Sequence, residues 1–266
     1  MQVPMNVSST IFREYDIRGI VGDDLTVAVA EAVGRAYATR LRRTVDRPVV
    51  AVGYDNRPSS PELADALAAG LNAAGADVRL VGTVPTPALY YAADVWATDG
   101  GIQITGSHNP PEYNGIKMIV GDRALYGAAI QELRELVESD RYADGSGSTE
   151  RHEILERYAE EIGRRAGVEG PVKLVLDCGN GTGSVIAPQA LALAGIDVDC
   201  LYCESDGTFP NHHPDPTVDK NVVDLIARVK ATGADLGVGL DGDADRIGAV
   251  TELSLIHISE PTRPSP

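Results

Sequence analysis

Short apolar segments alternate with longer segments rich in alanine and leucine along most of this 266-residue chain. The short segments are rich in β-branched residues and have the length of buried strands. The longer ones have helical periodicity, and several end at a glycine, as at Gly75, Gly195 and Gly233. This alternation is typical of α/β proteins with mixed, mostly parallel sheets. Strands are expected at residues 48–52, 77–81, 101–105, 115–120, 172–176, 197–202, 235–240 and 247–250, and helices at 26–42, 60–74, 128–139, 154–165, 184–194 and 222–231.

A polar segment at residues 143–150, which contains no apolar periodicity, divides the chain. We interpret it as a linker or mobile connection between two consecutive α/β domains, residues 1–142 and 143–253. Both domains repeat the order strand, helix, glycine, strand, which is a weak internal repeat. Residues 254–266 contain three prolines near their end, which are incompatible with a continuing helix or sheet. This tail is similar to adapter-derived translations that end many metagenomic gene predictions, so we expect a foreign segment and a truncated reading frame.

The excess of acidic residues limits which kinds of partner the chain can bind. Asp and Glu number 39 against 23 Lys and Arg, a net charge of −16, and no basic stripe offsets it, so nucleic acid is disfavoured. No apolar run is long enough to cross a membrane, and no signal sequence is recognisable. The three cysteines, Cys178, Cys200 and Cys203, are too few and too irregular for a disulfide framework. A reducing, cytoplasmic location is therefore expected.

Three carboxylates, those of Asp241, Asp243 and Asp245, occupy alternate positions directly after the strand expected at residues 235–240. Two such charges about 4 Å apart repel by about 4 kcal/mol at an effective dielectric constant of 20, so their convergence requires a cation. Hard oxygen ligands favour Mg²⁺ or Ca²⁺ over Zn²⁺. The alternative interpretation is an exposed acidic turn whose carboxylates are solvated.

Residues 105–111 (Thr-Gly-Ser-His-Asn-Pro-Pro) follow another expected strand. Ser107 could be a nucleophile with His108 as its base, but adjacent side chains normally diverge and the Gly-x-Ser-x-Gly pattern is absent. Ser107 could instead carry a phosphoryl group. The third interpretation is a polar turn stabilised by its own side chains.

Several other polar segments have ordinary structural interpretations when each is considered alone. Arg18 and Arg57 lie in loops that contain glycine and could bind phosphate, although each could simply pair with a neighbouring Asp. Lys117 lies on the next expected strand and could be a solvated edge residue. Residues 177–183 are interpreted as a tight strand-to-helix turn without nucleotide binding. Residues 209–216, with two adjacent histidines, are interpreted as a structural loop.

Taken together and in this order, the segments at residues 12–19, 53–60, 105–110, 115–117, 209–216 and 241–246 resemble the α-D-phosphohexomutases, in particular the phosphomannomutase/phosphoglucomutase branch. The resemblance implies that Ser107 is the catalytic phosphoserine and that Mg²⁺ is bound by Asp241, Asp243, Asp245 and the Ser107 phosphate. It further implies catalytic roles for His108, Lys117 and Arg246, and substrate or phosphate contacts for Tyr15, Arg18 and Arg57. Gly106 departs from the family, in which alanine is usual at this position, and we expect this change to be mild.

The reaction implied by this resemblance exchanges phosphate between C1 and C6 of mannose or glucose phosphate through a hexose 1,6-bisphosphate. The partners expected are therefore hexose phosphates and bisphosphates. The family has four domains, and this chain is expected to be the first half of such an enzyme. Two alternatives remain: a metal- or phosphate-binding fragment without catalysis, and a phosphatase with Asp241 as nucleophile. The preferred sugar and the oligomeric state are not predicted.

Overall fold

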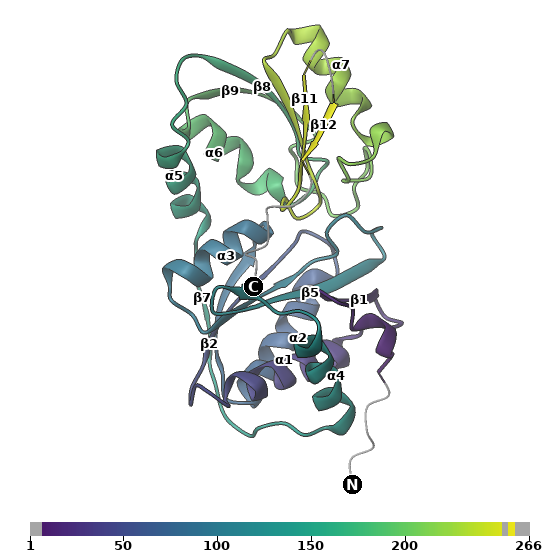
Figure 1. Ribbon diagram of the computed structural model, residues 1–266, viewed down its shortest axis with the longest axis vertical. Helices are drawn as coiled ribbons and strands as arrows, with labels where there is room; N and C mark the ends of the chain where they lie inside the picture. The colour runs from purple at the N-terminus through teal and green to yellow at the C-terminus, as the bar shows by residue number, and fades with distance from the viewer. Residues whose placement is uncertain (1–6, 252–254, 259–266) are drawn as a thin grey trace. The chain divides into compact units, whose positions relative to one another are not determined.

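The computed structural model describes residues 7–251 and 255–258, and the chain forms two compact units (Figure 1). Unit 1 comprises Met1–Gly82 and Leu89–His152, and unit 2 comprises Thr83–Ala88 and Glu153–Pro266. A short segment from the first half of the chain therefore belongs to unit 2.

Unit 1 is built on a mixed sheet with the strand order β1-β5-β4-β2-β3-β7, in which β6 also pairs with β5. The β2/β4 and β3/β7 pairs are parallel, whereas β5 is antiparallel to β1, β4 and β6. The strands are β1 (Ile17–Ile20), β2 (Val49–Tyr54), β3 (Asp77–Thr83), β4 (Gly100–Ile104), β5 (Tyr113–Val120), β6 (Arg123–Ala124) and β7 (Thr149–Arg151).

The helices of unit 1 cover both faces of this sheet. Helices α1 (Val27–Leu41), α2 (Ser60–Ala73) and α4 (Ala128–Ser139) lie on one face (Figure 1). Helix α3 (Thr86–Val95), which belongs to unit 1 from Leu89 onward, lies on the other face, and a short 3-10 turn, η1 (Ser9–Ile11), precedes β1. Helix α1 begins where the Thr26 hydroxyl accepts a hydrogen bond from Val29 N at 3.2 Å. Two glycines let α1 and α2 pack closely, since a Cβ on Gly34 would lie 2.2 Å from the Leu67 carbonyl oxygen.

Unit 2 has a second mixed sheet with the order β12-β11-β10-β8-β9. Strand β8 is parallel to β9 and β10, and β11 is antiparallel to β10 and β12. Because successive side chains of a strand face opposite ways, Leu174 and Leu176 pack with α6 residues, whereas Val175 packs with α7. The strands are β8 (Val172–Asp177), β9 (Ile196–Leu201), β10 (Leu236–Leu240), β11 (Ile247–Val250) and β12 (Leu255–Ile258); the helices are α5 (Leu155–Arg165), α6 (Ala187–Leu193) and α7 (Val223–Thr232), with 3-10 turns η2 (Thr182–Val185) and η3 (Asp219–Asn221).

The predicted α/β class and the mixed character of both sheets are confirmed, and each expected strand and helix is present. The strand at residues 247–250 and the helix at residues 128–139 have the predicted bounds, and the other elements have shifted ends. The helix expected at residues 184–194 is shorter, since the 3-10 turn η2 precedes it and α6 begins only at Ala187, with Pro188 in its first turn. Sequence analysis did not predict α3 or the strands β1, β6, β7 and β12.

The interpretation of residues 143–150 as a mobile linker is wrong for most of that segment. Gly145 N donates to Ala73 O at 3.0 Å, and Gly147 N donates to Asn72 O at 2.9 Å. A Cβ on Gly147 would lie only 1.9 Å from Ala76 O, so the glycines permit close backbone contact rather than freedom. The segment then continues into β7, which pairs with β3.

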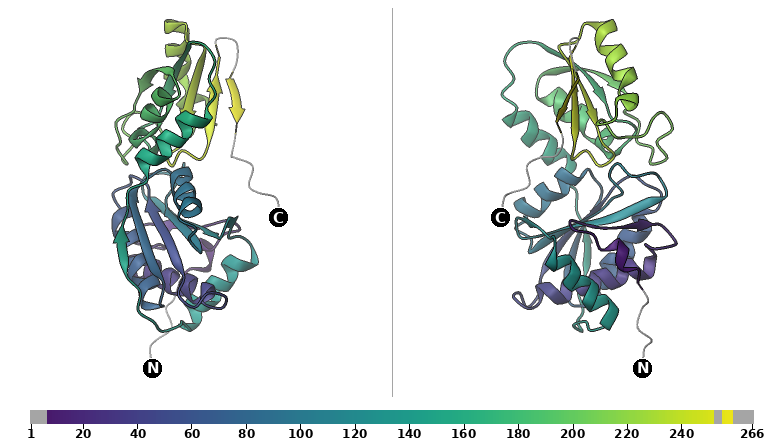
Figure 2. Two further views of the ribbon diagram at one scale, coloured as in Figure 1. Left: turned by 90° about the vertical axis from the view of Figure 1, so that its left-hand side faces the viewer. Right: turned by 45° about the vertical axis from the view of Figure 1, so that its right-hand side comes forward.

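The expectation that residues 254–266 take no part in a sheet is also wrong for four of them. Leu255–Ile258 form β12 beside β11 at the edge of the unit 2 sheet (Figure 2). The prolines that suggested a break begin only at Pro261, and the other tail residues lie outside the described ranges. All three cysteines are free thiols. None of the helices within the described residues has the length and apolar character needed to span a membrane.

Candidate active site

The serine loop, residues 105–113, connects the antiparallel strands β4 and β5 in unit 1. Ser107 is buried at its tip and has a left-handed backbone with φ of +50°, an uncommon conformation for a residue other than glycine. Its N–H donates to the Thr105 hydroxyl at 2.8 Å, and its Oγ lies 3.3 Å from His108 Nδ1. The expectation that these adjacent side chains diverge is wrong, since the left-handed residue breaks the alternation of an extended chain.

Arg57, which follows β2, holds the serine loop through hydrogen bonds to its backbone. Its guanidinium is fully buried, and its Nε donates to Asp55 Oδ2 at 3.1 Å. The two terminal nitrogens donate to the carbonyl oxygens of Ser107 (2.8 Å), Asn109 (2.7 Å), Pro110 (2.7 Å) and Tyr113 (3.1 Å). All five N–H groups of the guanidinium are therefore bonded to the protein. The predicted phosphate contact of Arg57, which would need an N–H group that faces the ligand, stays a prediction.

Two further contacts complete the base of the loop. Asp55 Oδ2 also accepts a hydrogen bond from Gly106 N at 3.0 Å, so the Asp55–Arg57 pair binds both backbone donors and backbone acceptors of the loop. A Cβ on Gly106 would lie 2.5 Å from Arg57 Cζ and Nε. Alanine at this position would require the guanidinium to move, so Gly106 lies directly against the residue that holds the loop.

Arg18, on β1, also lies beside the serine loop. It is buried, and its terminal nitrogens donate to Asn109 Oδ1 at 2.9 Å and to Asp16 Oδ2 at 2.5 Å. Its Nε is buried and has no hydrogen-bond partner among the residues that the structure describes. Tyr15 is 52% exposed and lies near Tyr126, with ring centroids 6.4 Å apart.

Lys117 lies on β5 and pairs with Gln103 on β4. Gln103 is two residues before Thr105, the first residue of the serine loop. The β4/β5 pair therefore places the lysine close in register to the start of the serine loop. Its side chain is partly exposed, unlike that of Gln103, which is fully buried.

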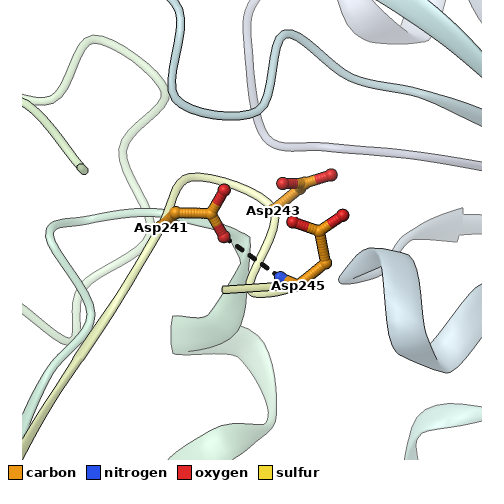
Figure 3. A group of neighbouring side chains, drawn as sticks. All are labelled: Asp241, Asp243 and Asp245. Carbon is orange, nitrogen blue, oxygen red and sulfur yellow. Dashed lines mark hydrogen bonds between the residues drawn. The ribbon is translucent and has the colours of Figure 1, made fainter. Parts of the chain in front are cut away.

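The aspartate loop, residues 241–246, connects the antiparallel strands β10 and β11 in unit 2. It folds around its own first carboxylate: Asp241 Oδ1 accepts a hydrogen bond from Asp245 N at 3.0 Å (Figure 3). The same oxygen also accepts from Arg246 N at 3.1 Å. Ala244 N donates to Asp241 O at 3.0 Å. Asp241 and Asp243 are fully buried, and Asp245 is partly buried. Arg246 forms a long contact with Asp245 at 4.0 Å.

The three carboxylates fit a hard divalent cation. One oxygen from each lies within 4.8 Å of the others. Opposite ligands of one Mg²⁺ or Ca²⁺ ion stand about 4.2–4.8 Å apart, given metal–oxygen distances of about 2.1–2.4 Å. Buried carboxylates this close need a compensating positive charge, and an all-oxygen donor set suits a hard cation. The structure thus favours a metal site over a solvated acidic turn.

Thr86 is a residue of this site that sequence analysis missed. It is the first residue of α3, and its hydroxyl donates to Asp243 Oδ2 at 2.6 Å. No local pattern indicates this bond, because 157 positions separate the two residues. A tertiary contact of that length is visible only in the folded chain.

The loop at residues 209–216 is anchored by an ion pair. His212 Nε2 lies 3.1 Å from both oxygens of Asp177, the last residue of β8, and Asp177 Oδ1 also accepts from Gly179 N at 2.9 Å. Burial acts to lower the pKa of His212, but the hydrogen bond and charge of Asp177 outweigh it, so the pKa is raised. The structural interpretation of residues 177–183 and 209–216 agrees with these contacts.

The fold and these loops define a chain of two α/β/α domains, each with a polar loop at its strand ends. Two family models match it: phosphoglucomutase/phosphomannomutase, alpha/beta/alpha domain I, over residues 9–144, and domain II over residues 156–254. The chain belongs to the phosphoglucomutase/phosphomannomutase family.

Relatives agree with this assignment. The chain is 51% identical over 249 residues to a phosphomannomutase/phosphoglucomutase from Pseudomonas aeruginosa, which covers 93% of this chain and 53% of the relative. It is 44% identical over 250 residues to a phosphoglucomutase from Neisseria meningitidis, covering 93% and 54%. A family structure from Burkholderia thailandensis superposes with a TM-score of 0.89 at 43% identity, covering 94% of this chain and 56% of that one. The chain spans about half the length of the curated relatives it matches.

Proposed function

We propose that this chain contributes the phosphoserine and metal-binding loops of a phosphohexomutase, which exchanges phosphate between C1 and C6 of mannose or glucose phosphate. The observation that carries the proposal is the family match, which spans both the serine loop and the aspartate loop. The geometry supports it, since the Ser107 hydroxyl is fixed by a strained turn and the three aspartates can hold a divalent cation.

The proposed chemistry is transfer of a phosphoryl group between Ser107 and a sugar hydroxyl. The P–O bond to phospho-Ser107 breaks, a P–O bond to the hexose oxygen forms, and the hydroxyl proton passes to a base, for which Lys117 and His108 are the candidates. Reorientation of the hexose 1,6-bisphosphate then returns its other phosphoryl group to Ser107. The nearness of His108 Nδ1 to Ser107 Oγ supports a role at this oxygen.

Asp241, Asp243 and Asp245, together with the Ser107 phosphate, would hold Mg²⁺. When bound, the ion supplies positive charge that neutralises phosphoryl oxygens in the transition state. Arg246, beside this cluster, is proposed to pair with the phosphate. Arg18 and Tyr15 are proposed as substrate contacts, and the buried Nε of Arg18 supports this role. For Arg57 we propose that it positions the serine loop instead of binding substrate, because its N–H groups already bond to the protein. We also propose a cytoplasmic location, supported by the three free thiols.

The test is intact-mass analysis of the 266-residue chain after incubation with Mg²⁺ and glucose or mannose 1,6-bisphosphate. We expect a gain of one phosphoryl group, located on Ser107 by fragmentation and absent from Ser107→Ala. Ser139→Ala, which alters an exposed helical serine, is the matched control and should retain the gain. A phosphoryl group labile to hydroxylamine would indicate a phosphatase with Asp241 as nucleophile. No covalent gain, with metal binding intact, would leave a non-catalytic metal-binding fragment as the function.

A further inference from the structure

Asp243, the central residue of the aspartate loop, is held by two hydrogen bonds from one distant residue. Thr86 Oγ1 donates to Asp243 Oδ2 at 2.6 Å, and Thr86 N donates to Asp243 O at 3.0 Å. Both residues are fully buried. Thr86 belongs to the segment Thr83–Ala88, which is part of unit 2 with the aspartate loop. One residue therefore fixes both the backbone and the carboxylate of Asp243.

The sequence around Thr86 makes this donor specific. Pro85 and Pro87 flank it and have no N–H, so Thr86 supplies the only backbone donor of the three residues. Ala88 N donates to Pro85 O at 2.9 Å, which closes the turn around Thr86. The proline rings also restrict the backbone on both sides, so the threonine is presented to Asp243 with little freedom to reorient.

We infer that Thr86 is a positioning residue of the metal site, an inference that rests on the proposed metal-binding role of the aspartate loop. A carboxylate that supplies one ligand oxygen to a metal is oriented by the partner of its other oxygen. The Thr86 hydroxyl holds Asp243 Oδ2 and thereby sets the rotation of the carboxylate relative to Asp241 and Asp245. Loss of an outer partner of this kind typically weakens metal binding about 10- to 100-fold.

The experiment is a titration of the 266-residue chain with Mn²⁺, used as a spectroscopic substitute for Mg²⁺ and followed by electron paramagnetic resonance. Thr86→Val removes the hydroxyl but keeps the shape, and we expect the Kd for Mn²⁺ to rise at least about tenfold. Thr86→Ser keeps the hydroxyl and should stay within about twofold of the unaltered chain. The matched control is Thr98→Val, which removes a buried hydroxyl of unit 1 that donates to Gly100 O at 2.8 Å. It should leave Mn²⁺ affinity unchanged.

The outcomes separate this inference from the proposed function. A folded Thr86→Val chain with unchanged affinity overturns the inference, as does a Thr86→Ser chain that loses as much affinity as the valine variant. Should the valine variant not fold, Thr86→Cys replaces it, because a thiol is a much weaker donor of similar size. The Thr86→Cys chain must then bind Mn²⁺ more weakly than the Thr86→Ser chain. An unaltered chain without Mn²⁺ affinity overturns both the inference and the metal site, whereas Mn²⁺ binding without phosphorylation of Ser107 refutes only the mutase proposal.

Discussion

The serine loop and the aspartate loop are both short turns between antiparallel strands, but they are held in different ways. The serine loop depends on Arg57, a residue fifty positions away that bonds to Ser107 O and to three other carbonyl oxygens. The aspartate loop folds mainly around Asp241, its own first residue. From outside, Thr86 donates two hydrogen bonds to Asp243, and Thr182 N donates one to Gly242 O at 2.8 Å. A loop that a remote side chain holds can be disrupted from outside its own sequence, whereas a self-bonded loop is altered mainly from within.

The most severe disruption is expected from Arg57→Met. This substitution leaves the buried Asp55 carboxylate without its cation and removes donors from four carbonyl oxygens of the serine loop. Removal of one partner of a buried ion pair costs about 3–5 kcal/mol, which we expect as the loss in unfolding free energy measured with urea. Arg47→Met is the matched control. Arg47 is bonded bidentately to Asp77 but is 66% exposed, so its loss should destabilise the chain far less than the loss of Arg57. Equal effects of the two variants would mean that Arg57 does not hold the loop.

The difference between the loops also explains what could be predicted from sequence. The alternation of strands and helices predicted both sheets, because core burial imposes a period on each element. The aspartate loop was identifiable because its three carboxylates lie within five residues and the bonds to Asp241 are local. The contacts of Arg57 and Thr86 were not predictable, since they join residues that become neighbours only when the strands and helices have packed.

Two elements show why other predictions failed. Residues 143–150 have the composition of a flexible linker, yet Gly145 and Gly147 are needed because the backbone passes close to the end of α2 and to Ala76. Composition alone does not distinguish a glycine that gives freedom from one that permits contact. Strand β1 has only four residues, too few for a recognisable period, and it is defined by its pairing with β5.

Metal binding should protect the strands beside the aspartate loop from amide hydrogen exchange more than those beside the serine loop. An ion that binds only the native state stabilises it by about 2.7 kcal/mol at a concentration 100 times its Kd, which lowers the population of the globally open state about 100-fold. We therefore expect Mg²⁺ to slow amide hydrogen exchange in β10 and β11 of unit 2, measured by mass spectrometry. Asp243→Asn should abolish this protection. Equal protection of β4 and β5 in unit 1 of the isolated chain would show that the ion does not act through the aspartate loop alone.

Two substitutions at Asp241 test whether the Asp241 carboxylate stabilises the aspartate loop. Asp241→Asn removes the charge but keeps an oxygen that can accept from Asp245 N and Arg246 N, whereas Asp241→Ala removes both. In metal-free buffer, the alanine variant should be less stable than the asparagine variant by about 1–2 kcal/mol, measured by urea unfolding. Both should lose Mn²⁺ affinity. Equal stability of the two variants would contradict the structural role of the Asp241 carboxylate.

The smallest effect concerns the ion pair that anchors residues 209–216. Asp177 raises the pKa of His212 in the folded chain, against the opposing effect of burial, and Asp224 adds to the rise. A raised folded pKa means that the pair contributes fully below the ordinary histidine pKa of about 6.5 and that this contribution is lost as pH rises through the folded value. The stability advantage of the unaltered chain over His212→Gln should therefore be larger at pH 6 than at pH 9, by about 1 kcal/mol. His213→Gln alters the neighbouring imidazole, for which no bond to Asp177 is present in the described structure, and it should show no such dependence. An advantage that is constant with pH would mean that His212 anchors the loop as a neutral hydrogen-bond donor, and that the charge of Asp177 adds nothing to its stability.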